Sequence, residues 1–255
     1  MSLSGRMALV TGGSRGIGRG IAIALAKAGA DVAINYRSDG DAAAEVVDDI
    51  KAIGRRSKAY QASVADYDAC AAMMAQIEAD FGGLSILINN AGIASRGLPV
   101  ADTDPLEFER VMRTHAFGPH YLSKLALPLL RAHDRSDIVM ISSTATLQMA
   151  PYGAPYNMGK AATEALALTL SKEERASGVR VNIVAPSLTV SDMGSRLAMA
   201  IAGVDDIHAL DAQSPFGRVS TPDDVAAAVL WLVSDANTYV TGQKINIDGG
   251  GPTGL

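Results

Sequence analysis

The sequence predicts an α/β fold in which about seven parallel strands form a doubly wound sheet with helices on both faces. Short runs rich in Val and Ile alternate with longer segments of helical periodicity along almost the whole chain. The runs are short and rich in Val and Ile, which is typical of parallel strands buried on both faces. With 255 residues, 48% of them hydrophobic, the chain can bury one sizeable core. We therefore expect a single domain over residues 1–255.

Seven runs are expected to be strands, and six periodic segments are expected to be helices between them. The strands are predicted at residues 6–11, 31–36, 57–62, 85–89, 136–142, 180–184 and 244–247. The helices are predicted at residues 17–28, 41–53, 66–81, 105–131, 155–177 and 222–234. The last helix has the clearest start, because Thr221 can cap it and Pro222 suits its first position.

Residues 187–219 break the alternation of strand and helix. We expect them to form an irregular or helical insertion that follows the carboxyl end of a strand. Inserted segments in that position often act as lids over a binding site. The insertion is therefore a candidate substrate loop.

Composition excludes several kinds of partner. The chain has 22 basic and 27 acidic side chains, a net charge of −5, so nucleic acid is not an expected partner. A lone cysteine, Cys70, cannot form an internal disulfide, which suits a reducing compartment. The first residues lack the form of a signal peptide, and no apolar run reaches the ~20 residues that span a bilayer. We expect a cytoplasmic protein with no membrane contact and no metal site.

The first predicted strand runs directly into a glycine-rich turn that opens a helix, with glycines at positions 12, 16 and 18. Glycine allows a tight turn and a close approach of the backbone to a phosphate, while a helix amino terminus presents free N–H groups to the anion. The turn therefore predicts a dinucleotide site; the alternative is a plain structural turn. The expected contacts in this turn are Gly12, Ser14, Arg15, Gly16, Ile17 and Gly18.

The end of the second strand indicates which dinucleotide binds. NAD sites usually place a carboxylate there for the ribose 2′-hydroxyl, and an acid would repel a 2′-phosphate. Here Tyr36 holds that position, followed by Arg37 and Ser38, and Arg15 could approach the same phosphate. We therefore expect NADP(H) in preference to NAD(H); the alternative is that both arginines are ordinary surface charges.

Three residues form a candidate catalytic set. Tyr156 and Lys160 are four residues apart, on one face of a predicted helix. A phenol titrates near ~10, and a nearby ammonium stabilises the phenolate, so the pair could exchange protons near neutral pH. Ser143 follows a predicted strand, which places its hydroxyl at the carboxyl edge of the sheet, where ligands bind in α/β folds. Each residue alone could be structural, but the set predicts an oxidoreductase site.

Taken together, these motifs resemble the classical short-chain dehydrogenase/reductase family over nearly the whole chain. The resemblance includes the Thr11–Gly18 turn, Asn89-Asn90-Ala91-Gly92, Ser143, Tyr156-x-x-x-Lys160, Ala185-Pro186 and Asp248-Gly249-Gly250. It implies a Rossmann-type fold in which Tyr156 is the general acid/base, Ser143 orients the carbonyl, and Lys160 lowers the tyrosine's pKa and binds the nicotinamide ribose. The further cofactor contacts it implies are Ser63, Val64, Asn90, Ala91, Gly92, Pro186 and Thr189.

Three positions depart from the family pattern. His115 stands where the family usually has Asn, whose backbone carbonyl holds a water of the proton relay. We expect the backbone role to survive, and His115 could also titrate near neutral pH as a further catalytic residue; the alternative is a tolerated helix residue. Ser63 replaces an aspartate that contacts adenine. Ser187 replaces a glycine and adds a side chain near the nicotinamide.

The expected substrate is a small carbonyl or alcohol compound, whose identity the sequence does not give. Its contacts are expected from residues 94–98, 144–152 and 187–219, where apolar side chains could either form a substrate wall or pack the insertion: Met193, Leu197, Met199, Ile201 and Phe216. The leading activity is reduction of ketones or 3-oxoacyl thioesters. The alternatives are a sugar or polyol dehydrogenase and a non-catalytic NADP-binding regulator. Excess apolar surface on helices 105–131 and 155–177 predicts a homo-oligomer, tetramer or dimer.

Overall fold

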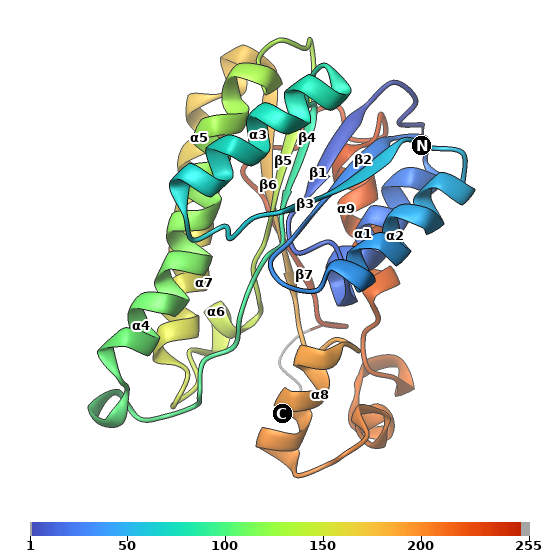
Figure 1. Ribbon diagram of the computed structural model, residues 1–255. Helices are drawn as coiled ribbons and strands as arrows, with labels where there is room; N and C mark the ends of the chain where they lie inside the picture. Colours follow the sequence, from blue (N-terminus) through green and yellow to red (C-terminus); the bar gives the residue numbers. More distant parts are fainter. Residues whose placement is uncertain (1, 251–255) are drawn as a thin grey trace.

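The strands form one parallel sheet (Figure 1). The computed structural model describes residues 2–250. Within them the sheet has the order β3-β2-β1-β4-β5-β6-β7, and every neighbouring pair is parallel. The strands are β1 (Met7–Val10), β2 (Asp31–Tyr36), β3 (Ser57–Gln61), β4 (Ile86–Asn89), β5 (Ser136–Ile141), β6 (Val179–Pro186) and β7 (Lys244–Ile247). The predicted fold class and all seven strands are confirmed.

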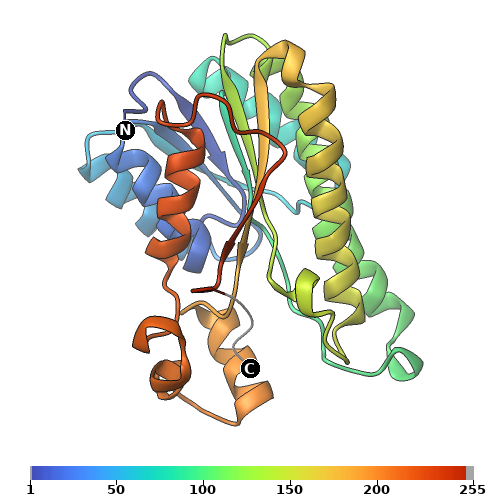
Figure 2. The ribbon, with the colours of Figure 1, turned by 180° about the vertical axis from the view of Figure 1, so that it is seen from behind.

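Helices cover both faces of the sheet (Figures 1 and 2). One face carries α1 (Gly16–Lys27), α2 (Gly40–Ala52) and α9 (Pro222–Val233), and the other carries α3 (Tyr67–Phe81), α5 (Gly118–Leu130) and α7 (Ala154–Glu173). Strand β4 shows why its sequence is apolar at every position, because Ile86 and Ile88 belong to one core and Leu87 to the other. Buried apolar side chains thus fix the sheet from both sides.

The order of the strands reverses beside β1, which pairs with β2 on one side and β4 on the other. Loops at the carboxyl ends of these strands diverge toward opposite faces, and ligands of open α/β sheets bind in the crevice between them. Most of the predicted site residues lie at or just after the carboxyl ends of β1 to β6, while His115 lies on η2 and Tyr156 and Lys160 lie on α7. The topology therefore brings the predicted site to one edge of the sheet.

The helix predicted at residues 105–131 is divided into three segments. These are α4 (Pro105–Met112), a π-helical turn η2 (Arg113–Phe117) and α5. Pro119 has no N–H, so it cannot donate to the carbonyl of His115 one turn earlier. The N–H of Gly118 bonds to the Arg113 carbonyl instead, and the Thr163 hydroxyl donates to the His115 carbonyl at 2.6 Å. A proline thus opens the helix beside the site.

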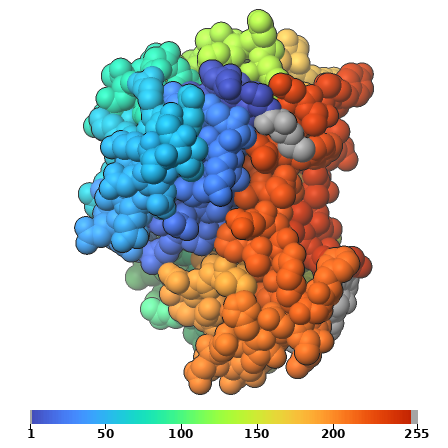
Figure 3. All heavy atoms as spheres, turned by 90° about the vertical axis from the view of Figure 1, so that its right-hand side faces the viewer, coloured from blue at the N-terminus to red at the C-terminus, as the bar shows by residue number. Residues whose placement is uncertain are grey.

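Residues 187–219 project beyond the carboxyl edge of the sheet. They contain α8 (Asp192–Ala202), η4 (Ile207–Gln213) and η5 (Pro215–Gly217), and Figure 3 shows them in light orange to orange below the blue helices. A small core of their own holds these turns together: Ala198, Ile207, Leu210 and Val219. Larger apolar side chains of the segment remain exposed, among them Leu197, Met199, Ile201 and Phe216. A short helix that the sequence did not predict, α6 (Ala145–Gln148), lies across from this segment.

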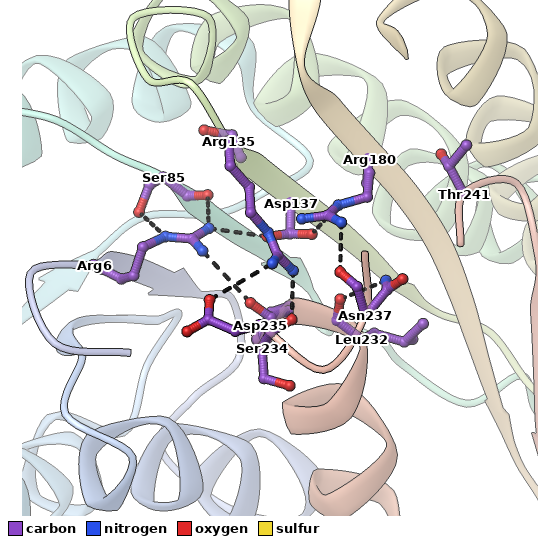
Figure 4. Close-up of polar contacts among 12 residues, drawn as sticks. Arg6, Ser85, Arg135, Asp137, Arg180, Leu232, Ser234, Asp235, Asn237 and Thr241 are labelled. Atoms are coloured by element: carbon purple, nitrogen blue, oxygen red, sulfur yellow. Dashed lines mark hydrogen bonds and ion pairs between the residues drawn. The ribbon is translucent and has the colours of Figure 1, made fainter. Parts of the chain in front are cut away.

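At the opposite, amino edge of the sheet, three arginines surround one buried carboxylate (Figure 4). Asp137, which is 2% exposed, contacts Arg6 at 2.9 Å, Arg135 at 3.3 Å and Arg180 at 3.2 Å. Arg135 also donates to the Ser234 carbonyl at 2.6 Å, just beyond the end of α9. We name Arg6, Arg135, Asp137 and Arg180 the amino-end clamp, because they tie β1, β5 and β6 to the end of α9.

Within residues 2–250, no helix combines the length and the apolar composition that a membrane span requires.

Candidate active site

All the predicted catalytic and cofactor residues line one cavity at the carboxyl edge of the sheet. Its volume is about 1,650 Å³, larger than the ~300–1,000 Å³ of a pocket for one small molecule. Two ligands can therefore share the space. Its walls come from the glycine-rich turn, the loops after β4 and β5, α7, and the segment after β6.

The glycine-rich turn has the shape of a phosphate cradle. Gly12 and Gly16 have φ values of 59° and 52°, which L side chains rarely adopt. A Cβ at Gly18 would overlap the Gly12 carbonyl oxygen. Helix α1 begins with no side-chain cap and no acid in its first turn, so its first N–H groups stay free for an anion. The turn therefore fits a dinucleotide pyrophosphate.

Asn90 holds this turn in place. Its Nδ2 donates to the Thr11 carbonyl at 2.8 Å and to the Gly12 carbonyl at 3.1 Å. The Thr11 hydroxyl oxygen accepts in return from the backbone N–H groups of Asn90 and Ala91, both at 2.9 Å. The loop after β4 and the turn after β1 are thus joined by reciprocal hydrogen bonds.

The end of β2 contains one carboxylate that the sequence analysis missed. Tyr36, Arg37 and Ser38 line the cavity as expected, and Arg37 is exposed. Asp39, which follows them, caps α2 by accepting from the Ala42 N–H at 3.1 Å. Its carboxylate also lies 4.0 Å from Arg15. An Asp just before a helical run is the usual N-cap signature, and that signal could have found it.

Arg15 is therefore shared among several partners. Besides Asp39, it contacts the carboxylate of Asp192, the first residue of α8, at 3.4 Å. These exposed pairs partly neutralise the guanidinium. Arg37 is left as the cation of the β2 end best suited to an added phosphate.

The three predicted catalytic residues meet on one wall of the cavity. Tyr156 and Lys160 lie in successive turns of α7, and Ser143 follows β5. Ser143 and Tyr156 both line the cavity, and the Ser143 side chain is near enough to the phenol to affect its pKa. The Lys160 Nζ lies 5.7 Å from the centre of the Tyr156 ring and donates to the Ile141 carbonyl at 2.7 Å.

Burial sets the charge state of this set. It raises the pKa of the Tyr156 phenol, and the neighbouring Ser143 side chain opposes that rise only in part. Burial therefore outweighs the expected lowering of the phenol pKa by Lys160, whose ammonium donates to the Ile141 carbonyl, and the effect of Lys160 on proton transfer stays a prediction. Burial also lowers the pKa of Lys160 to about 8, against an opposing effect of Glu164. At neutral pH the phenol is protonated and the lysine is mostly charged.

His115 is buried and uncharged. Its side chain lies edge-on to the Tyr156 ring, with 5.2 Å between ring centres. Its Nε2 is 3.1 Å from the Ile93 nitrogen and 2.8 Å from the Ile93 oxygen. Burial, and then the charge of Lys160, lower its pKa to about 3. The expectation that His115 titrates near neutral pH is therefore wrong, and its geometry is that of a spacer beside the phenol.

Comparison with known proteins agrees with this geometry. A family model described as enoyl-(acyl carrier protein) reductase matches residues 12–251. Versicolorin reductase stcU of Emericella nidulans is 38% identical over 97% of this chain and 96% of its own length. The chain belongs to the short-chain dehydrogenase/reductase family.

Two more relatives span the same length. The 3-oxoacyl-[acyl-carrier-protein] reductase FabG of Staphylococcus aureus is 37% identical over 96% of this chain and 97% of its own. The crystal structure of the angucycline C-6 ketoreductase LanV with bound NADP has a TM-score of 0.87 and 36% identity, covering 98% of this chain and 96% of that one. The family's oxidoreductase chemistry on CH–OH groups therefore extends to this chain.

The two other departures from the family pattern have local explanations. The Ser187 hydroxyl donates to the Ile247 carbonyl at 3.1 Å, so its side chain is tied to β7. Thr189 is 4% exposed and donates to the Ser187 carbonyl at 3.0 Å, which stiffens the start of the segment after β6. Ser63 lines the cavity with Val64, where its hydroxyl replaces the family's carboxylate. Among the described residues, no three His, Cys, Asp or Glu side chains gather closely enough to hold a metal ion.

Proposed function

We propose that this protein is an NADP(H)-dependent reductase of ketones or 3-oxoacyl compounds. The observation that carries the proposal is the meeting of Ser143, Tyr156 and Lys160 on one wall of the cavity that also contains the phosphate cradle. A phenol that holds its proton at neutral pH can donate it to a carbonyl oxygen during reduction. The relatives named as a versicolorin reductase, a 3-oxoacyl-[acyl-carrier-protein] reductase and an angucycline C-6 ketoreductase support the same direction.

In the proposed mechanism each residue has one task. Ser143 and Tyr156 both hydrogen-bond the carbonyl oxygen and hold it in the cavity. The bound nicotinamide supplies the hydride to the carbonyl carbon. Tyr156 gives its proton to the oxygen as negative charge develops there, and Ser143 stabilises that charge by hydrogen bonding. Lys160 keeps a positive charge beside the phenol, which eases the loss of its proton.

We further propose a preference for NADP(H) over NAD(H). The proposal is supported by Tyr36 at the position that favours an acid in NAD sites, and by the exposed Arg37 beside it. The other proposed cofactor contacts are the residues predicted from the sequence, all of which line the cavity.

We also propose a single domain with a substrate loop at about 187–219, acting as a homodimer or homotetramer in the cytoplasm. Assembly is supported by apolar side chains that the helices α4 and α7 and the π-helical turn η2 leave exposed: Leu106, Phe117, Met158 and Leu168. The lone, buried Cys70 suits a reducing compartment.

Two measurements test the function. NADPH oxidation should be screened over ketones and 3-oxoacyl thioesters, and NADP⁺ reduction over sugars and polyols; turnover restricted to the second set would contradict the proposed substrate class. Tyr156→Phe should then lower kcat by about a hundredfold or more, because it removes the proton donor. Tyr239→Phe, at a fully exposed phenol, is the matched control. Wild-type turnover in Tyr156→Phe would refute the catalytic role.

A further inference from the structure

A carboxylate lies one turn beyond Lys160 on the same face of α7. Tyr156, Lys160 and Glu164 are spaced by four residues, so they form one row along the helix. The Glu164 Oε1 accepts hydrogen bonds from the Ser142 hydroxyl at 2.5 Å and the Thr146 hydroxyl at 2.8 Å. The mechanism above does not use Glu164.

A lysine from a distant strand completes this cluster. The Lys244 Nζ, on β7, lies 2.8 Å from Glu164 Oε1 and donates to the Thr146 Oγ1 at 2.6 Å. Only 18% of the Glu164 side chain and 20% of the Lys244 side chain are exposed. An ion pair this sheltered from solvent holds its geometry more firmly than a surface pair.

The cluster contacts the chain on both sides of Ser143. Ser142 immediately precedes Ser143, and the Thr146 hydroxyl lies 2.8 Å from the Ser143 carbonyl oxygen. Thr146 has one hydroxyl proton, so it donates either to that carbonyl or to Glu164, while it accepts from Lys244. Ser143 is therefore presented by a short segment whose two ends are fixed to one carboxylate.

Glu164 also supplies negative charge to Lys160. The titratable groups around the Lys160 ammonium are Tyr156 and Glu164 on its own helix and His115 on η2. At neutral pH His115 is uncharged and Tyr156 is protonated, so the compensating charge comes from Glu164. Lys160 itself is 5% exposed, and burial disfavours its charged form.

We propose that Glu164 is a positioning residue for the reductase reaction: its carboxylate fixes the segment that presents Ser143 and keeps the buried Lys160 ammonium protonated. The inference rests on the catalytic roles proposed above for Ser143, Tyr156 and Lys160. Lys244 orients the carboxylate without touching the catalytic residues. A purely structural cluster would affect folding alone.

The pH dependence of kcat/KM for NADPH oxidation tests the electrostatic part. Glu164→Gln keeps an acceptor oxygen but loses the charge, so the fall in activity at high pH should move down by about one pH unit, with about fivefold lower kcat/KM at pH 8. Lys244→Met leaves the carboxylate in place and should not move the fall downward. An unmoved profile in Glu164→Gln, or equal downward shifts in both variants, would overturn the electrostatic role. Glu173→Gln, at an exposed acid near the end of the same helix, is the control.

A second variant tests the positioning part, also in case Glu164→Gln fails to fold. Thr146→Val removes the hydroxyl that bonds to Glu164 or to the Ser143 carbonyl and that accepts from Lys244, and it leaves all charges unchanged. We expect kcat to fall several-fold with no displacement of the pH profile. An unchanged kcat would refute the positioning role. Tyr156→Phe separates failure of the proposed function from failure of this inference. If Tyr156→Phe abolishes turnover while Glu164→Gln and Thr146→Val behave as wild type, only the role of Glu164 is refuted.

Discussion

Replacement of Asn90 by alanine should loosen the phosphate cradle without disturbing the loop that carries it. The substitution removes two hydrogen bonds, to the Thr11 and Gly12 carbonyls. The backbone hydrogen bonds to the Thr11 hydroxyl do not depend on the side chain and should persist. At about 1 kcal/mol for each bond lost, we expect a destabilisation of about 2 kcal/mol. In a chain of this size that corresponds to a fall in Tm of about 4–8 °C.

The same variant should weaken cofactor binding, because the freed Gly12 carbonyl no longer fixes the turn that faces the phosphates. A tenfold rise in the Kd for NADPH would reduce the stabilisation at saturating NADPH by about 1.4 kcal/mol. Thermal melts with and without NADPH measure both effects, with Asn246→Ala as an exposed asparagine control. A variant that matches wild type in Tm and in NADPH affinity would refute the role assigned to Asn90.

Two further predictions concern charge. Arg37→Ala should raise the Kd for NADPH about five- to tenfold and leave that for NADH nearly unchanged, since a hydrogen-bonded charge at an exposed site contributes modestly; equal losses for both cofactors in a fluorescence titration would exclude a contact with the 2′-phosphate. In the reductive direction, kcat/KM should fall as pH rises through about 8, because the charged form of Lys160 disappears above its pKa. No step should appear near pH 6.5, because the pKa of His115 is about 3; a step there would show that His115 titrates during turnover.

Much of the site follows from short-range spacing. The glycines at 12, 16 and 18 lie in the segment that joins β1 to the first turn of α1, and Tyr156 and Lys160 lie one helical turn apart. Their relative positions are set by local backbone geometry, which the sequence pattern contains. The central strands are equally local, since β1, β4 and β5 are short runs buried at every position, as expected for a parallel sheet covered on both faces.

The features that were missed depend on contacts between distant residues. The ion pair between Glu164 and Lys244 joins residues 80 positions apart, and no local pattern indicates it. The direction of the Tyr156 pKa follows from its burial, which depends on the whole fold. The π-helical turn was missed because Pro119 interrupts the helix without interrupting its apolar period. A proline inside a periodic run was the one local sign of it.

The amino-end clamp has a consequence for the opposite side of the molecule. Three strands and the last helix are fastened together at the end of the sheet most remote from the cavity. The ion pairs that hold the strands together and the residues of the cavity thus lie at opposite ends of the sheet. Loops at the reactive end can change length or composition through evolution while the fastened end preserves the framework. The same separation makes the segment after β6 the natural place to engineer a new specificity.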